Sequence, residues 1–172
     1  MTELMPLLSE EQIHTRIKAV AQKISEDHQG KNLIMIGVLK GAFIFLADLV
    51  RQISIPCTID FIGASSYGKE KMSSGHVRIT KDVDLNLDGA HVVLVEDIVD
   101  TGLTLSYLIK HLENRGAASV KICTLLDKHE RRENNVPLDY VCHTIQEGFI
   151  VGYGIDYAEK YRHLPAIYHI QS

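Results

Sequence analysis

The chain has 172 residues, of which 45% are hydrophobic and 23% are charged, and its formal net charge is −4. This length indicates one domain, and the apolar content excludes a disordered chain. The lack of a basic excess argues against a protein that binds duplex nucleic acid. The three cysteines form no CxxC pair, so neither a zinc knuckle nor a dithiol motif is expected.

The first residues are acidic and lack the apolar region of a signal peptide. The most hydrophobic stretch, 33–50, is interrupted by Lys40 and Asp48, which favours a strand, a turn and a helix over a membrane span. We therefore expect a cytoplasmic protein with no membrane association. Cys123 and Cys142 lie in apolar runs and are expected to be buried structural residues.

The predicted elements begin with a helix. Ser9 and Gln12 have the spacing of a capping box, and isoleucines at helical intervals follow until Gly30. The apolar run 33–38 predicts a strand buried on both faces. A helix over 42–53 and a second strand over 56–62 come next.

The segment 64–76 is rich in serine and glycine and predicts a long polar loop, which is usually functional or mobile. A helix is predicted over 103–115, with Gly116 as its C-cap residue. Further strands are predicted at 77–83, 91–95, 119–126, 136–143, 149–152 and 166–170. Strands alternate with helices at βαβ spacing, so the sequence predicts an α/β fold with a mainly parallel twisted sheet flanked by helices.

The residues that can do chemistry gather in the segment 92–105, VVLVEDIVDTGLTL. An apolar strand precedes Glu96 and Asp97, a polar loop follows at 100–104, and a helix then begins. Backbone N–H groups at a helix N-terminus bind phosphate, and carboxylates bind sugar hydroxyls and magnesium. No Walker loop is present, and no GxGxxG follows this strand. The alternative is that Asp100 and Thr101 only cap the helix, but so dense a group of acids and hydroxyls favours a binding site.

This segment resembles the phosphoribosyl-pyrophosphate-binding motif of the type I phosphoribosyltransferases. Four other segments resemble the hypoxanthine-guanine branch of that family. VLKGAFIF (38–45) is similar to its pyrophosphate loop, and SSYG (65–68) to the start of its mobile active-site loop. LLDKHERR (125–132) resembles the segment with the purine-contacting lysine, and GFIVGYGIDYAEKYRHLP (148–165) the base-binding hood segment. The match begins near residue 7 and runs through nearly the whole chain.

The resemblance implies a purine salvage enzyme that transfers 5-phosphoribose from phosphoribosyl pyrophosphate to N9 of hypoxanthine or guanine. It implies Mg²⁺ as cofactor, a homodimer or homotetramer, and one domain over 1–172 with a small hood built from about 1–15 and 138–172. Two alternatives stay open. A nucleotide-sensing regulatory protein on the same fold is disfavoured by the acidic balance, and a xanthine-preferring relative fits the Lys128 and Phe149 segments less well.

Roles for single residues also come from the resemblance. Asp100 is expected to accept the proton of the base. The residues expected to bind phosphoribosyl pyrophosphate are Lys40, Gly41, Glu96, Asp97, Asp100, Thr101, Gly102, Leu103, Thr104 and Arg162. Those expected to bind the purine are Lys128, Phe149, Ile150 and Asp156; those for magnesium are Glu96, Asp97 and Asp156; those in the mobile loop are Ser66 and Tyr67. A cis peptide bond is expected before Lys40. The residues alone leave open that Lys40 and Lys128 are surface lysines and that Phe149 belongs to the core.

Overall fold

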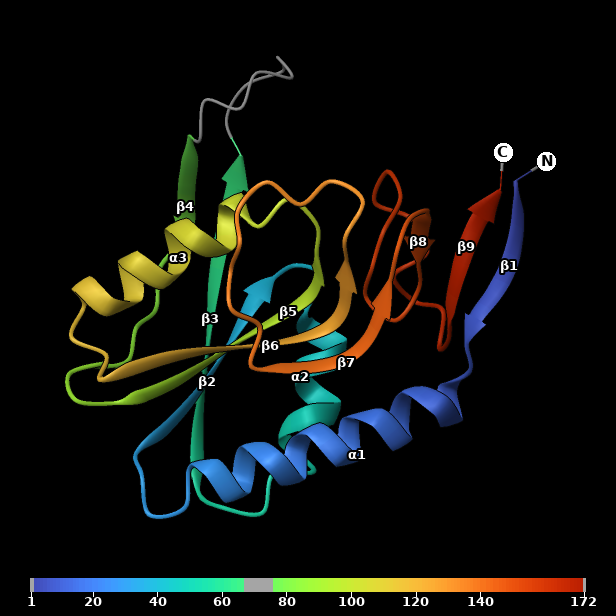
Figure 1. Cartoon of the computed structure of the whole chain (residues 1–172). Coiled ribbons are helices and arrows are strands. Elements are labelled where there is room, and N and C mark those ends of the chain that lie inside the picture. Colours follow the sequence, from blue (N-terminus) through green and yellow to red (C-terminus); the bar gives the residue numbers. More distant parts are fainter. Residues whose placement is uncertain (1, 67–75, 172) are drawn as a thin grey trace.

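The computed structural model describes residues 2–66 and 76–171 (Figure 1). Most of the predicted loop 64–76, with Tyr67, therefore lies outside the described residues. The elements are β1 (Glu3–Leu8), α1 (Glu10–Asp27), β2 (Leu33–Leu39), α2 (Phe43–Val50), β3 (Cys57–Ser66), β4 (Val77–Lys81), β5 (His91–Val99), α3 (Leu103–Asn114), β6 (Ser119–Lys128), β7 (Tyr140–Ile145), β8 (Phe149–Val151) and β9 (Ile167–Gln171).

A six-stranded sheet with the order β4-β3-β2-β5-β6-β7 forms the centre of the molecule. The neighbouring pairs β3–β2, β2–β5, β5–β6 and β6–β7 are parallel, and β4 pairs antiparallel with β3 at one edge of the sheet. Helices α1 and α2 cover one face, and α3 covers the other (Figure 1). This confirms the predicted α/β fold with a mainly parallel sheet flanked by helices.

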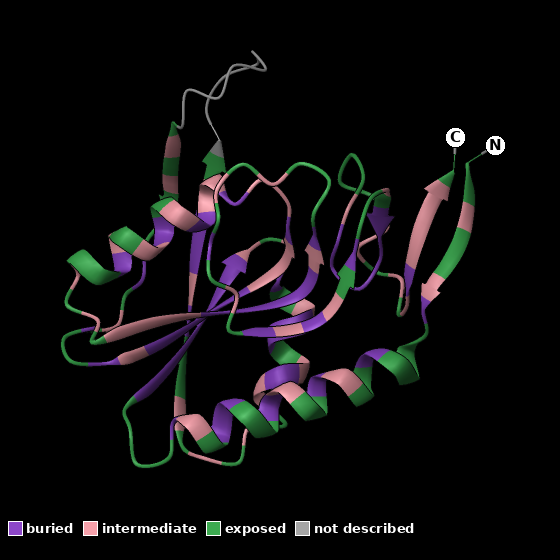
Figure 2. Cartoon of the chain, viewed as in Figure 1, coloured by how far each residue is buried: buried purple, intermediate pink, exposed green. Residues whose placement is uncertain are grey.

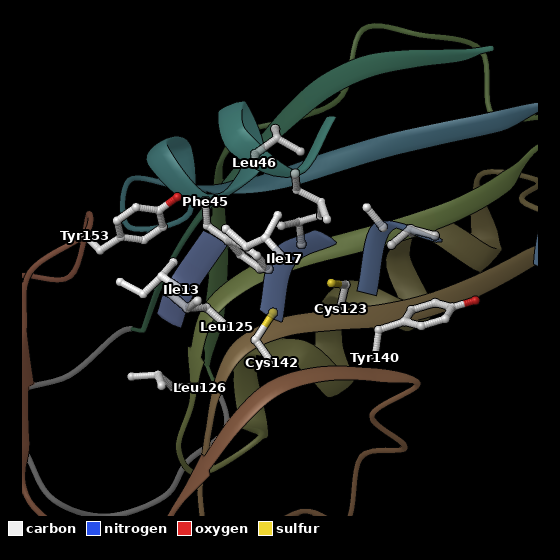
Figure 3. Packing of buried hydrophobic residues seen from close by; sticks show 14 of the residues in the cluster. Ile13, Ile17, Phe45, Leu46, Cys123, Leu125, Leu126, Tyr140, Cys142 and Tyr153 are labelled. Atoms are coloured by element: carbon white, nitrogen blue, oxygen red, sulfur yellow. The ribbon is translucent and has the colours of Figure 1, made fainter. Parts of the chain in front are cut away.

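The central strands β2 and β5 are buried on both faces (Figure 2). In β2, Met35 packs into the cluster with α1 and α2, whereas its neighbours Ile34 and Ile36 pack toward α3, as the two-residue period of a strand requires. Figure 3 shows the first cluster, in which side chains of α1 and α2 pack against β6 and β7. Cys123 and Cys142 belong to it and are buried, as expected.

Some boundaries differ from the sequence-based prediction. β5 continues through Glu96 and Asp97 to Val99 because Glu96, Ile98 and Val99 pair with β6, so the acidic pair lies within the strand and not after it. β3 likewise continues to Ser66, since its last residues pair with β4, and the loop begins later than residue 64. The strand predicted at 136–143 begins only at Tyr140.

A smaller antiparallel sheet with the order β1-β9-β8 stands beside the main one. β1 pairs with β9, which places the two ends of the chain side by side (Figure 1). This sheet includes fewer residues than the hood expected over about 1–15 and 138–172. β7, which lies within the second range, pairs with β6 and belongs to the main sheet. Ser9 caps α1 through the expected capping box with Gln12. No helix in the described parts of the chain is long and apolar enough to span a bilayer.

The buried carboxylate of Asp60 holds the turn after β4 against β3. Its Oδ1 accepts a hydrogen bond from Phe61 N (2.7 Å), and its Oδ2 accepts from Asp84 N (2.8 Å) and Leu85 N (3.0 Å). Burial opposes ionisation, but these donors and the nearby Lys81 ammonium outweigh it. The pKa of Asp60 therefore lies below its ordinary value.

Asp60→Asn is expected to lower the free energy of unfolding by about 2–4 kcal/mol at pH 7, because an amide replaces an anion that accepts three N–H groups. Since the folded pKa of Asp60 is lowered, its contribution is present above the unfolded pKa of about 3.9 and is lost as the pH falls through the folded value. Urea unfolding at pH 7 and pH 3 measures both effects. The exposed Asp84→Asn is the control and should change stability by less than about 0.5 kcal/mol. Equal losses in the two variants would contradict this role.

Candidate active site

The candidate site lies at the carboxyl ends of β2 and β5. From these neighbouring strands the chain proceeds in opposite directions, to β3 on one side and β6 on the other. Open α/β sheets bind ligands in the crevice outside such a divergence. A cavity of about 290 Å³ lies there, and its lining includes Gly41, Glu96, Asp97, Asp100, Thr101, Gly102, Thr104, Asp156 and Arg162.

Two adjacent acids, Glu96 and Asp97, occupy one wall of this cavity. Burial and the negative charge of Asp97 raise the pKa of Glu96 well above its ordinary value. Neither carboxylate forms an ion pair with any residue that the structure describes. The two carboxyl groups thus have no cationic partner within the described protein, which suits sugar hydroxyls or a cation brought in by a ligand.

The connection from β5 to α3 places the N-terminus of α3 at the cavity. Gly102 is the N-cap residue of α3, with φ of 84°, and no side chain caps the helix at that position. A Cβ on Gly102 would lie 2.7 Å from the Asn134 carbonyl oxygen, so glycine is required for this close approach as well as for the backbone conformation. The first N–H groups of a helix lack intrahelical acceptors, and here they adjoin the cavity, where an anion can bind them.

Asp100 is not a helix cap. Its Oδ1 is buried and has no hydrogen-bond partner among the described residues. Its Oδ2 lies 3.4 Å from the Arg131 Nε. The alternative that Asp100 serves only to begin α3 is therefore not supported, and its carboxylate lines the cavity instead.

The loop after β2 approaches the acidic pair closely. A Cβ at Gly41 would overlap the Asp97 carboxylate, so a larger residue would force this carboxylate to move. The Leu39–Lys40 peptide bond is cis, as the family resemblance implied. Lys40 Nζ lies 3.0 Å from Glu159 Oε2, and Arg162 Nη2 lies 3.2 Å from Glu159 Oε1.

Glu159 therefore forms ion pairs with both of the predicted pyrophosphate-binding cations, Lys40 and Arg162. No motif in the sequence identified Glu159 as part of the site. Hydrogen bonds from Lys40 and Arg162 lower its pKa. A pyrophosphate that bound both cations would compete with this carboxylate for them. The only signal in the sequence is an acid three residues before Arg162, which is common on solvated surfaces.

The predicted purine residues Lys128 and Phe149 lie together. Lys128 is only 8% exposed, and its Nζ lies 5.9 Å from the centroid of the Phe149 ring. Phe149 is 66% exposed, so its ring is not part of the core and offers a free face. Tyr157 meets it edge-on at 6.4 Å between centroids. Ile150, in contrast, is buried.

Asp156 is not brought together with Glu96 and Asp97 as a metal-binding group. Its carboxylate lies 3.3 Å from Arg162 Nη2 and accepts a hydrogen bond from Glu159 N (2.8 Å). Within the described residues, no three His, Cys, Asp or Glu side chains gather to hold an ion. Magnesium commonly binds through one or two carboxylates, waters and substrate phosphates, and the Glu96–Asp97 pair fits that donor set.

The N-terminus of α3, an acidic pair without counter-ions and Arg162 line one cavity, and such a cavity in an α/β protein suits a phosphorylated sugar. The sequence matches the family described as "Phosphoribosyl transferase domain" over residues 7–158. The chain belongs to this family.

The relatives agree with this assignment. The chain is 48% identical over 161 residues to a hypoxanthine-guanine phosphoribosyltransferase of Streptococcus thermophilus, covering 94% of this chain and 89% of the relative. It is 45% identical to the Bacillus subtilis enzyme of the same name, with the same coverage. A solved hypoxanthine-guanine phosphoribosyltransferase of Bacillus anthracis superposes with a TM-score of 0.93 at 46% identity and covers 100% of both chains. The resemblance inferred from the motifs is confirmed.

Proposed function

We propose that this chain is a purine salvage phosphoribosyltransferase that converts hypoxanthine or guanine and phosphoribosyl pyrophosphate into IMP or GMP and pyrophosphate. The observation that supports it best is that Lys128, at the end of β6, lies beside the exposed ring of Phe149, while the cavity proposed for phosphate and ribose lies at the end of the neighbouring strand β5. A flat base and a phosphorylated sugar can thus occupy adjacent subsites.

Different groups of described residues would bind the ribose, the 5-phosphate and the pyrophosphate of the sugar substrate. Glu96 and Asp97 would hold the ribose hydroxyls, and the 5-phosphate would occupy the first turn of α3. The residues proposed to surround that phosphate are Thr101, Gly102, Leu103 and Thr104. Lys40, Gly41 and Arg162 would bind the pyrophosphate, where cations stabilise its growing negative charge.

In the proposed reaction, the bond from C1 of the ribose to pyrophosphate breaks and a bond from C1 to N9 of the purine forms. C1 develops oxocarbenium character as the leaving group departs. The purine loses one proton, which Asp100 accepts. Phe149 would stack on the base, Ile150 would contribute backbone groups to its edge, and Asp156 would contact that edge as well.

Mg²⁺ is the proposed cofactor, held by Glu96 and Asp97 together with the substrate phosphates, where it would offset their charge. We expect chelation with excess EDTA to abolish activity and added Mg²⁺ to restore it. Pyrophosphate release, followed before and after chelation, measures this. Full activity after exhaustive metal removal would exclude the assignment.

The base site should discriminate against adenine. The Lys128 ammonium donates hydrogen bonds and cannot accept them, so it suits the O6 acceptor of a 6-oxopurine and not the 6-amino group of adenine. A buried donor that faces a donor costs about 1–3 kcal/mol, which predicts a kcat/KM for adenine about 10- to 100-fold below that for hypoxanthine. Lys128→Met should remove most of this difference. A wild-type enzyme that uses both bases equally would contradict the role of Lys128.

The test of the overall function is pyrophosphate release with phosphoribosyl pyrophosphate, Mg²⁺ and each purine in turn. Turnover with hypoxanthine or guanine supports the proposal. Faster turnover with xanthine would favour the xanthine-preferring alternative. Ligand binding without turnover would favour a nucleotide-sensing regulatory protein.

Assembly and location are part of the same proposal. We propose a homodimer or homotetramer in the cytoplasm, in which the small sheet β1-β9-β8 serves as a hood over the base because it contains Phe149. Light scattering on the purified protein determines the oligomeric state.

A further inference from the structure

Arg132, in the segment that follows β6, contacts both halves of the candidate site. Its Nε donates to the Asp100 carbonyl oxygen (2.8 Å), and its Nη2 donates to the carbonyl oxygens of Val99 (3.3 Å) and Lys128 (3.2 Å). Nη2 also pairs with the Asp127 carboxylate. One guanidinium therefore joins the end of β5 to the end of β6.

The same segment binds the next carbonyl of the phosphate loop. The Thr101 carbonyl oxygen accepts hydrogen bonds from Glu133 N (2.9 Å) and Asn134 N (3.0 Å). Three consecutive carbonyls, at residues 99–101, are thus bonded to residues 132–134. A carbonyl oxygen carries partial negative charge and would repel a phosphate, whereas an N–H group attracts it.

We propose that Arg132 is a positioning residue that keeps these carbonyls away from the 5-phosphate and couples the phosphate loop to the base-binding Lys128. This inference rests on the proposed function. The planar guanidinium can donate to several acceptors in fixed directions, which the single ammonium of lysine cannot reproduce. The Arg132 side chain is 20% exposed.

Arg132→Lys in the full chain tests this role. The readout is the ratio of the affinities for IMP and inosine, because the two ligands differ only in the 5-phosphate. We expect the ratio to fall about tenfold or more, since the carbonyls of the phosphate loop lose a charged donor. The KM values for hypoxanthine and for phosphoribosyl pyrophosphate should rise together, because the Lys128 carbonyl oxygen accepts a hydrogen bond from the same guanidinium.

Arg51→Lys is the matched control. Arg51 also donates to a carbonyl, that of Ala47 (3.1 Å), and pairs with the Asp48 carboxylate, but it lies at the end of α2. Its replacement should leave the IMP-to-inosine ratio unchanged. Asp127→Asn is a second variant, for use if Arg132→Lys does not fold. It retains Arg132 but weakens the contact of the Asp127 side chain with Nη2, and it should also lower the IMP-to-inosine ratio.

The outcomes separate the two proposals. Wild-type protein that binds IMP no more tightly than inosine would overturn the proposed function and, with it, this role. A strong wild-type preference that persists in folded Arg132→Lys or Asp127→Asn protein would overturn the role of Arg132 alone. A KM that rises only for phosphoribosyl pyrophosphate would overturn the coupling to the base subsite.

Discussion

Asp100→Asn is expected to lower kcat by about 10²–10⁴-fold, the usual contribution of general base catalysis, while the affinity for phosphoribosyl pyrophosphate stays nearly unchanged. The amide has the size of the carboxylate but cannot take the proton that the purine loses. The structure is compatible with this role because Asp100 Oδ1 has no described hydrogen-bond partner and the side chain lines the cavity. Steady-state kinetics together with equilibrium binding measure the two effects.

Asp97→Asn is the comparison variant for this prediction. Asp97 belongs to the acidic pair proposed for ribose and magnesium, so its replacement should weaken substrate or metal binding more than the chemical step. If Asp100→Asn retains near-normal kcat, the proton of the purine leaves by another route.

Gly41→Ala should lower kcat/KM by about 100-fold, because misplacing a reactive group by an ångström can cost that much. The added methyl group would overlap the Asp97 carboxylate, which has to move away from its place beside Glu96. Binding of phosphoribosyl pyrophosphate by calorimetry, combined with the rate of pyrophosphate release, measures the loss.

Gly30→Ala provides the control for Gly41→Ala. Gly30 follows α1, and a Cβ there would meet no atom within 4 Å. Its φ of 74° makes alanine unfavourable, so this variant should lose some stability but keep kcat/KM. An active Gly41→Ala enzyme would mean that the Asp97 carboxylate can move without consequence.

The sequence was sufficient to predict the elements whose pattern is local. The capping box at Ser9 and the apolar runs of β2 and β5 gave the helix and the central strands. The ends of β3 and β5 were missed because they depend on pairing with β4 and β6, which no local pattern encodes. β1 was also missed: it is held by β9 at the other end of the chain, and Pro6 weakens its strand signal.

The candidate site, too, was predicted only where its residues form a local pattern. The motif at 92–105 is continuous, so the acidic pair and the phosphate loop could be identified from it. Glu159 and Arg132 could not, because each acts on residues distant in sequence: Glu159 on Lys40 and Arg132 on the carbonyls after β5. In the sequence both belong to charged runs that look like solvated surface.

The pairing of β8 with β9 alone in the small sheet has a consequence for the order in which the site is built during synthesis. The phosphate and ribose subsites come from β2 and β5, which are made early and can fold as the nascent chain grows. The strand that begins with Phe149 has no partner until β9, the last described element, has been made. The base subsite is therefore completed after the sugar subsite, because the Phe149 ring takes its place beside Lys128 of β6 only when β9 has paired with β8.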